Sequence, residues 1–484
     1  MRNPIGNPLR SLALAFAATA LVAAALPASS LATRVAAPTC APPPKPGGGG
    51  PTNPPPLKPT TVDTLHQAYT CLFDRYYGGP KLDNRLVLRA AFAGFTQELQ
   101  RRSKDHPVAT MPALTGDREA DWAAFADVYT KVTAALNTDA ATLQALAAAT
   151  MRAMVASLGD NHARWDRPEP DANNPEPDPG GDRMTVKAVG ISGISVHPED
   201  KAAKAPLYVT SVEAGSPAAK RGIRPGDILV SINGHAPFVN GVFVPSALDP
   251  LFLNRDAPVT FRLRRPTNGR TWTLTVKPAE FVVFRPEISA KRLADGVAYV
   301  KVPGFFGGVA DKVRAAVEDL RKAGTITGVV LDLRGNGGGS PREVTRLLGA
   351  FAHGKVTSYF CDVHDSCAAN RTDDTVPLLN LPFVVLTDRG CASACDDFSA
   401  AVKSLGLAPL VGSRTAGVVS GPGEPYFLDD GSVLGLPSKH HRGPGKEIVD
   451  TIGVAADHYL PMTAEDLAAG RDPALAKALD LLEG

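Results

Sequence analysis

The apolar residues between positions 61 and 165 recur at intervals of three and four, which is the spacing of one face of an α-helix. The run TLQALAAATMRAMVASL is typical, since it contains no Gly or Pro. Residues 184–280 instead contain short β-rich runs such as PLYVTSV, DILVSI and VTFRLRR, separated by turn residues. From residue 281 to 484, strand-like and helix-like runs alternate. The pattern predicts a multidomain α+β chain with a helical N-terminal domain, a β-rich domain and an α/β core.

Two segments show no such periodicity. Residues 33–60 contain APPPKPGGGGPTNPPPLKPT, and residues 166–183 contain RPEPDANNPEPDPGGD. Segments so rich in Pro and Gly cannot build a core, so both are predicted to be exposed linkers.

The first 32 residues resemble an export signal. Arg2 and Arg10 give a positive start, and the short apolar run SLALAFAATALVAAALPA follows. Ser30 and Ala32 suit cleavage after Ala32, although an uncleaved membrane anchor is the alternative. No second apolar stretch of about 20 residues occurs, so no further membrane contact is expected. The predicted location is exported: secreted, periplasmic or in the cell envelope.

Export makes disulfides possible among the six cysteines. Cys361 and Cys367 are expected to close the small loop CDVHDSC. Cys391 and Cys395 either pair with each other or stay free, and the pairing of the remaining cysteines is open.

The charge balance narrows the classes of function. The chain has 51 basic and 49 acidic side chains, which indicates neither nucleic acid nor an anionic membrane as a partner. It contains no HExxH and no Cys–His ligand spacing, so no metal is predicted. The Gly-rich LRGNGGGS lacks the Lys-Ser/Thr ending of a phosphate-binding loop. No cofactor is therefore expected.

The β-rich region contains GSPAAKRGIRPGDILVSING, which resembles a PDZ domain of bacterial proteases. This resemblance implies that VGISGIS holds the C-terminal carboxylate of a peptide. A Gly-rich turn can direct backbone N–H groups at an anion, and the following strand edge can pair with an extended tail. The alternative is a scaffold domain that binds no peptide. The predicted peptide-binding residues are Gly190, Ile191, Ser192, Gly193 and Ile194.

The α/β region repeats one plan twice. TGVVLDLRGNGGGSPREVTRLLGAF is a strand, a Gly loop and a helix, with Pro341 suited to the first helical turn. LPFVVLTDRGCASACDDFSAAVKSL repeats the plan with Ser393 in the loop. Loops at the carboxyl ends of such strands form the usual sites of α/β proteins. Ser393 lies in no G-x-S-x-G elbow, and by itself it fits a nucleophile or a helix N-cap equally well.

The two loops, the upstream PDZ segment and the GVAADHYLP tail together resemble the C-terminal processing (tail-specific) and tricorn-core serine peptidases. The resemblance implies a ClpP/crotonase-like peptidase core with Ser393 as the nucleophile. The backbone N–H groups of Ala394 and of Gly337 or Gly338 would form the oxyanion hole. Asp396 stands where the family often has Glu.

One position departs from the tail-specific pattern. Members of that group use a lysine from a T-F-G-K-G loop, but the matching stretch here is GSRTAGVVSG, with Val418 at the lysine position. Arg414 stays protonated at any working pH and cannot act as a base. Lys403 lies further along the helix of the nucleophile. A Ser–Lys pair is therefore disfavoured.

A histidine is the natural replacement, because its pKa lies near neutrality. In tricorn-type members a histidine from an S-H-A-like stretch activates the serine, and NHA resembles that stretch, with His162 preceded by Asn161. Those members also use a carboxylate near the C-terminus, and DTIGV places Asp450 there. His162 is predicted to be the base, oriented by Asn161 and Asp450. A structural histidine at a helix end and a solvated turn carboxylate remain the alternatives.

The sequence thus predicts an exported serine endopeptidase of the Ser–His, tricorn-like type that recognises unstructured C-terminal tails of proteins through its PDZ domain. The alternatives are an inactive PDZ-containing peptide-binding protein, another hydrolase such as an esterase, and a Ser–Lys enzyme with a lysine elsewhere. The natural substrate and the oligomeric state do not follow from the sequence.

Overall fold

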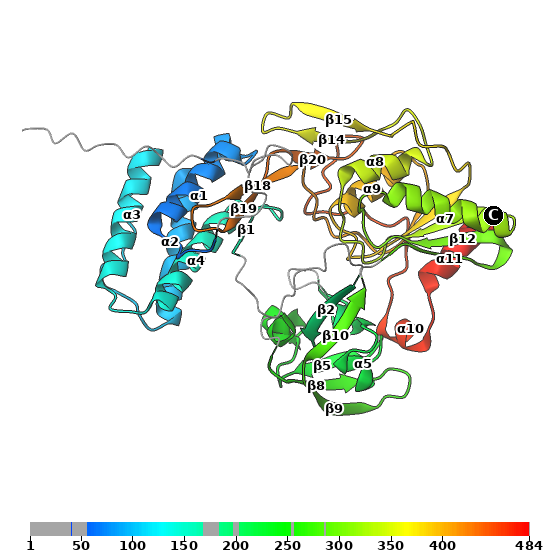
Figure 1. Ribbon diagram of the computed structural model, residues 1–484, viewed down its shortest axis with the longest axis horizontal. Coiled ribbons are helices and arrows are strands. Elements are labelled where there is room, and N and C mark those ends of the chain that lie inside the picture. Colours follow the sequence, from blue (N-terminus) through cyan, green and yellow to red (C-terminus); the bar gives the residue numbers. More distant parts are fainter. Residues whose placement is uncertain are drawn as a thin grey trace, which may run out of the picture. The chain divides into compact units, whose positions relative to one another are not determined.

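A computed structural model describes Cys40 and residues 56–167, 183–196, 203–252, 256–284 and 287–483 (Figure 1). The predicted signal peptide and most of both predicted linkers lie outside these ranges. The described chain mixes helices and strands in the predicted order, so the α+β fold class is confirmed. None of its helices is both long enough and apolar enough to cross a lipid bilayer.

The helical region contains four long helices whose apolar faces pack together. Each begins after a residue whose side chain accepts a hydrogen bond from an N–H of the first turn, which stabilises the helix start. Gly94 lets α2 and α4 approach closely, because a Cβ there would lie 2.6 Å from the carbonyl oxygen of Ala149. The elements are α1 (Val62–Arg75), η1 (Gly79–Lys81), α2 (Asn84–Arg101), α3 (Arg118–Ala135) and α4 (Ala140–Ala156).

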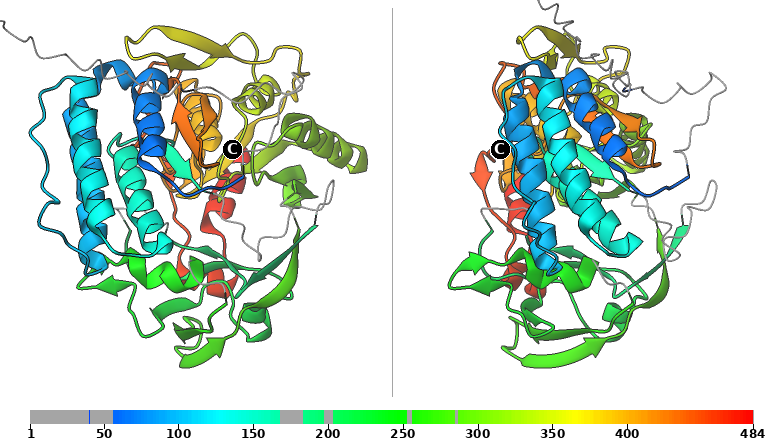
Figure 2. Two further views of the ribbon diagram at one scale, coloured as in Figure 1. Left: turned by 60° about the vertical axis from the view of Figure 1, so that its left-hand side comes forward. Right: turned by 90° about the vertical axis from the view of Figure 1, so that its left-hand side faces the viewer.

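A strand pair from the C-terminal half of the chain completes this helical core. β1 (Arg164–Asp166) pairs with β19 (Val433–Pro437), which pairs with β18 (Gly423–Phe427), all antiparallel. Figure 2 shows the orange strand pair beside the blue helices. The chain that leaves α4 is therefore held against the α/β region directly after residue 163. The side chains that enter the helical core are Tyr426, Leu428, Leu434 and Leu436.

The β-rich region forms its own core around Phe261, as its alternating pattern predicts. Its strands pair antiparallel as β5-β8-β9, β2-β10, β3-β4 and β6-β7. The elements are β2 (Arg183–Ala188), β3 (Ile191–Ile194), β4 (Val209–Val212), α5 (Pro217–Lys220), β5 (Ile228–Ile232), β6 (Phe238–Val239), β7 (Val242–Phe243), η2 (Pro245–Leu248), α6 (Asp249–Phe252), β8 (Val259–Arg264), β9 (Thr271–Val276) and β10 (Ala279–Phe284).

The α/β core is a six-stranded sheet in the order β11-β12-β13-β16-β17-β21, parallel except for β11. All five residues of both β13 and β16 are buried, as expected for central parallel strands. Helices α7, α8 and α9 contribute to the core on one face of the sheet, and α11 packs on the other. The elements are β11 (Ser289–Arg292), η3 (Ala294–Gly296), β12 (Val297–Lys301), α7 (Val309–Ala323), β13 (Gly328–Asp332), α8 (Pro341–Gly349), β16 (Phe383–Thr387), α9 (Ala394–Ser404), β17 (Leu410–Gly412), β21 (His458–Tyr459), α10 (Ala464–Ala469) and α11 (Pro473–Glu483).

A small antiparallel sheet lies beside the main one, with β14 (Val356–Cys361) between β15 (Cys367–Arg371) and β20 (His440–Arg442). The structure pairs Cys361 with Cys367, as expected from the sequence. It also contains the two pairings that the sequence left open, which are Cys40–Cys71 and Cys391–Cys395.

Candidate active site

Ser393 lies in a tight turn between β16 and α9. Its φ is 56° and its ψ is −117°, a conformation that costs a non-Gly residue about 1–3 kcal/mol. The turn is supported from two sides. The N–H of Ser393 donates to the carbonyl oxygen of Val418 at 2.7 Å and to Asp396 Oδ2 at 3.0 Å. Gly338 packs so closely that a Cβ there would lie 2.6 Å from Ser393 Cβ.

His162 reaches this turn from the end of the helical region. Asp160 Oδ1 accepts the N–H groups of His162 at 2.8 Å and Ala163 at 3.2 Å, which closes a turn between α4 and β1. Tyr76 O–H donates to Asp160 Oδ2 at 3.1 Å. With the turn fixed, His162 Nε2 lies 3.4 Å from Ser393 Oγ. This is slightly longer than a normal hydrogen bond, and catalytic contacts of this kind commonly tighten in the complex with substrate.

The tautomer of His162 follows from its neighbour. Asn161 Nδ2 donates to Asp450 Oδ1 at 2.8 Å, so Asn161 Oδ1 faces the ring and lies 2.6 Å from His162 Nδ1. Because an amide oxygen only accepts, Nδ1 carries the proton. The lone pair of Nε2 then faces Ser393 Oγ, as proton abstraction requires.

Asp450 acts on the ring through Asn161. Its Oδ1 also accepts the N–H of Val419 at 3.3 Å, which fixes the carboxylate. Burial lowers the pKa of His162 from its ordinary value, and the charges of Asp160 and Asp450 offset only part of this effect. The imidazole is therefore neutral, and able to accept a proton, at neutral pH.

The amides predicted for the oxyanion hole differ in their availability. The N–H of Gly338 already donates to Asn336 Oδ1 at 2.9 Å. The N–H groups of Gly337 and Ala394 have no acceptor among the described residues. Of the two glycines considered from the sequence, Gly337 is thus the one whose amide can receive an oxyanion.

One carboxylate joins the Gly loop to the nucleophile loop. Asp388 Oδ1 accepts the N–H of Gly335 at 2.8 Å and the N–H of Gly390 at 2.9 Å. The N–H of Ala392 also donates to the carbonyl oxygen of Asn336 at 3.0 Å. Burial raises the pKa of Asp388 above its ordinary value. No motif in the sequence singles out Asp388, although it directly follows β16.

Asp396 supports the other side of the nucleophile turn. Besides the Ser393 amide, it accepts the N–H groups of Gly417 at 2.9 Å and Val418 at 3.0 Å. Burial raises the pKa of this carboxyl despite these three donors. Val418 therefore supports Ser393 through its backbone, at the position where the resemblance to tail-specific peptidases implied a lysine.

The lysine considered from the sequence is engaged elsewhere. Lys403 Nζ pairs with Asp457 Oδ1 at 2.5 Å, near the C-terminal end of α9. At 1.5 Å of helix rise per residue this is about 15 Å from Ser393. Arg414 donates to the carbonyl oxygen of Gly453 at 3.0 Å. The described part of the chain contains no group of three or more side chains that could hold a metal ion.

The peptide-binding residues predicted in the PDZ segment lie on β3 and the turn before it. β3 pairs with β4, and no other described strand pairs with it, which leaves its second edge open. Gly190 has a φ of 89°, and a Cβ there would lie 2.1 Å from Ser216 Cβ, so the turn requires glycine. Ser192 Oγ donates to Ser211 Oγ at 3.0 Å. An open strand edge after a Gly turn is the geometry used for pairing with a peptide.

Comparison with protein families gives two matches. The model of peptidase family S41 matches residues 296–460, and that of the PDZ domain matches residues 208–237. The S41 match covers β12 to β21, including both loops and Asp450.

Among curated proteins, the chain is 29% identical over 293 residues to "Carboxyl-terminal-processing peptidase 2, chloroplastic" of Arabidopsis thaliana, covering 58% of this chain and 55% of that protein. It is 30% identical over 279 residues to "C-terminal processing peptidase, chloroplastic" of Tetradesmus obliquus, covering 52% and 56%. The chain thus spans little more than half the length of these relatives.

Among solved structures, the crystal structure of mature CPAF aligns with a TM-score of 0.51 at 14% identity, covering 87% of this chain and 95% of that one. At this identity the likeness concerns the fold alone.

Proposed function

We propose that this chain, which carries a family S41 peptidase region downstream of a PDZ domain, is a serine-type peptidase with a Ser–His site. The observation that carries the proposal is the 3.4 Å contact between Ser393 Oγ and His162 Nε2. The hydrogen bonds that link Asp450, Asn161 and the imidazole support the proposal, because they hold the ring of His162 in the tautomer that accepts a proton.

The reaction proceeds by acyl transfer. Ser393 Oγ attacks the carbonyl carbon of the scissile peptide bond while His162 Nε2 accepts the hydroxyl proton. The imidazolium then gives the proton to the leaving amine, and the amine departs. Water, deprotonated by the same nitrogen, attacks the acyl-enzyme and releases the acid.

The amides of Gly337 and Ala394 would stabilise the negative oxygen of each tetrahedral intermediate. The Ala394 amide belongs to the first turn of α9, where the helix dipole adds positive potential. Loss of one such donor typically lowers the rate by about 10²–10³-fold. Asn161 and Asp450 contact neither the serine nor this oxygen, so they act as positioning residues.

We further propose that the PDZ region recognises the C-terminal tail of the substrate and that the protein is exported. The open edge of β3 and its Gly190 turn suit an extended tail that ends in a free carboxylate. The N-terminal signal predicts export. The scissile bond is proposed to lie in an unstructured C-terminal region of a protein, because only an extended chain can occupy the β3 edge and the nucleophile turn together.

The experiment compares the wild type with Ser393→Ala and with Ser404→Ala, a matched control on the exposed part of α9. The substrates are casein, a peptide with an unstructured C-terminal tail (a tailed peptide) and p-nitrophenyl acetate. A fluorophosphonate probe reports the reactivity of the serine. The wild type and the control are expected to cleave peptide bonds and to be labelled at Ser393, whereas Ser393→Ala does neither.

Peptide binding without labelling or cleavage in the wild type would support the inactive binding protein instead. Turnover of the ester but not of the peptides would support another hydrolase. The alternative of an inactive binding protein arises because Val418 occupies the lysine position. The fluorophosphonate probe tests this alternative directly, because it labels only a reactive serine.

A further inference from the structure

We propose that the disulfide between Cys391 and Cys395 is a positioning device for the nucleophile, and that it holds Ser393 within reach of His162. This inference rests on the proposed peptidase function. It assigns a role to two residues that take no part in the chemistry described above. The two half-cystines stand two residues before and two residues after Ser393, so the cross-link spans the nucleophile turn.

Both half-cystines are fully buried and anchored on opposite sides of the turn. The N–H of Cys391 donates to the carbonyl oxygen of Asp388 at 3.1 Å, and its carbonyl oxygen accepts the N–H of Ala416 at 2.8 Å. Cys395 lies in the first turn of α9, and its N–H donates to the carbonyl oxygen of Ala392 at 2.9 Å. The S–S bond therefore joins the loop after β16 to the start of α9, with Ser393 between them.

The turn needs such a restraint because of its backbone conformation. Ser393 has a positive φ that a non-Gly residue rarely adopts, and such a residue persists only where its surroundings over-determine it. The N–H of Ser393 is held by the hydrogen bonds that it donates to the carbonyl oxygen of Val418 and to Asp396 Oδ2. The disulfide adds a covalent limit on the distance between the two ends of the turn.

The contact that depends on this turn tolerates little movement. Nε2 of His162 and Oγ of Ser393 are already 3.4 Å apart, at the outer limit of a hydrogen bond. A displacement of about 1 Å in reacting groups can cost roughly 10²-fold in rate. A turn that relaxes toward ordinary φ values would move Oγ by a distance of this order.

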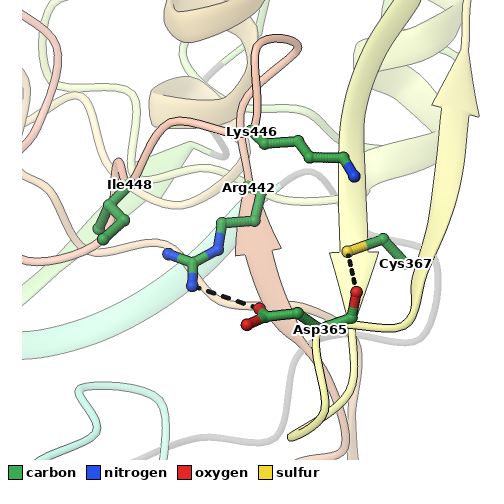
Figure 3. Close-up of a pocket in the computed structure, with 5 residues that line it drawn as sticks. All are labelled: Asp365, Cys367, Arg442, Lys446 and Ile448. Carbon is green, nitrogen blue, oxygen red and sulfur yellow. Dashed lines mark hydrogen bonds and ion pairs between the residues drawn. The ribbon is translucent and has the colours of Figure 1, made fainter.

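The chain offers a matched control in a second short disulfide. Cys361 and Cys367 are six positions apart in the sequence, against four for Cys391 and Cys395, and their disulfide joins the neighbouring strands β14 and β15. Cys367 lines an open pocket of about 300 Å³ together with Asp365, Arg442, Lys446 and Ile448. Figure 3 shows these five side chains. Within this pocket Arg442 faces Asp365 at 3.5 Å. Neither Cys361 nor Cys367 hydrogen-bonds to either loop of the candidate site in the described structure.

The experiment measures kcat and KM for one tailed peptide with Cys391→Ser, Cys395→Ser, the double variant, and the control double variant Cys361→Ser/Cys367→Ser. We expect each single variant and the double variant to lose at least tenfold in kcat, with KM within twofold of the wild type. The three losses should be equal, because either substitution abolishes the same bond. The control double variant is expected to keep kcat within twofold of the wild type, even if its Tm falls as much as that of the Cys391 and Cys395 variants.

A second measurement needs no substitution, so it remains possible where a cysteine variant does not fold. The wild-type protein is treated with a phosphine, which is oxidised to the phosphine oxide with oxygen from water while the S–S bond breaks and two thiols form. The thiols are alkylated, and mass spectrometry reports which cysteines opened and whether a fluorophosphonate labelled Ser393 in the same molecule. Molecules opened at Cys391 and Cys395 are expected to label at least tenfold more slowly than molecules opened only at Cys361 and Cys367.

The outcomes separate this inference from the proposed function. A wild type that neither cleaves nor labels overturns the function itself. An active wild type whose Cys391 and Cys395 variants keep kcat within twofold overturns only the positioning role. A loss of kcat no larger than in the control, or one that adds up over the single variants, also overturns it.

Discussion

At the residue scale, the candidate site depends on which nitrogen of His162 carries its proton. The amide of Asn161 stands between the imidazole and the carboxylate of Asp450, and it fixes the ring without carrying charge. The histidine is thus oriented by a neutral group and influenced by carboxylates that do not touch its ring nitrogens. The effect of burial on the pKa of His162 therefore exceeds that of the nearby carboxylates, and the pKa lies below its ordinary value.

The pH dependence of kcat/KM tests this balance in the variant Asp450→Ala. In the wild type, kcat/KM is expected to rise with pH through an inflection below about 6.5, because only the neutral imidazole accepts a proton. Asp450 raises the pKa of His162 through its charge, so its removal should move the inflection to lower pH. The plateau should also fall, because Asn161 loses its anchor. An inflection that stays in place or moves upward would show that Asp450 does not act on the ring.

The motifs around the site residues allowed part of this arrangement to be predicted. The residues singled out from short motifs, Ser393, His162, Asn161 and Asp450, lie together in the structure, and their catalytic roles stay a prediction. Asp388 was missed because an aspartate after a strand is a common turn residue, and nothing in the sequence shows which amides it will accept.

At the element scale, two loops at the ends of β13 and β16 must keep a fixed relative position. Asp388 joins them by accepting one amide from each. Gly335 and Gly390 are themselves exposed, so water can replace the carboxylate as their acceptor. The role of Asp388 is therefore expected to concern alignment more than stability.

The variant Asp388→Ala is expected to lower kcat by about tenfold or more, because the Gly loop that carries the Gly337 amide would no longer be aligned with Ser393. The Tm should change little. Asp388→Asn retains an oxygen that can accept both N–H groups, so it should restore most of the activity. Thermal melts and steady-state kinetics on the three proteins check this. A large fall in Tm with an unchanged kcat would assign the residue to stability instead.

The sequence was informative for elements whose pattern is local. The apolar runs of β13 and β16, the helical periodicity of residues 61–165 and Pro341 at the start of α8 all correspond to observed elements. The pairing of β1 with β19 was not predictable in this way. A short alternating strand does not specify its partner, and here the partner lies more than 250 residues further along the chain.

At the scale of the whole molecule, the helical region supplies the proposed base of a site whose nucleophile lies in the α/β core. Residues 160–163 leave α4 and enter β1, which β19 holds in place. The matches of the S41 peptidase model to residues 296–460 and of the PDZ model to residues 208–237 agree with the peptidase core and the PDZ segment recognised from the sequence. The signal peptide and the linkers stay predictions, because they fall largely outside the described residues.

The proposed recognition of C-terminal tails can be tested with two peptides that differ only at their end. A free carboxylate can accept charge-assisted hydrogen bonds from the backbone amides near Gly190, and a C-terminal amide cannot. We expect KM to be about tenfold lower for the free acid, with a similar kcat, since such bonds contribute about 1.5–3 kcal/mol. An internal cleavage site shared by both peptides keeps the chemistry constant. Equal KM values would leave the PDZ domain without a role in tail binding.

The most direct test of the central claim is the rate at which a fluorophosphonate labels Ser393 in the wild type and in His162→Gln, measured across pH. Labelling needs only the nucleophile and its base, so it is independent of the unknown substrate. The account predicts that wild-type labelling rises through an inflection below about 6.5 and that the variant labels about 10²–10⁴-fold more slowly, without this inflection. A folded His162→Gln protein that labels at the wild-type rate would contradict the account, because the proton of Ser393 would then leave by another route.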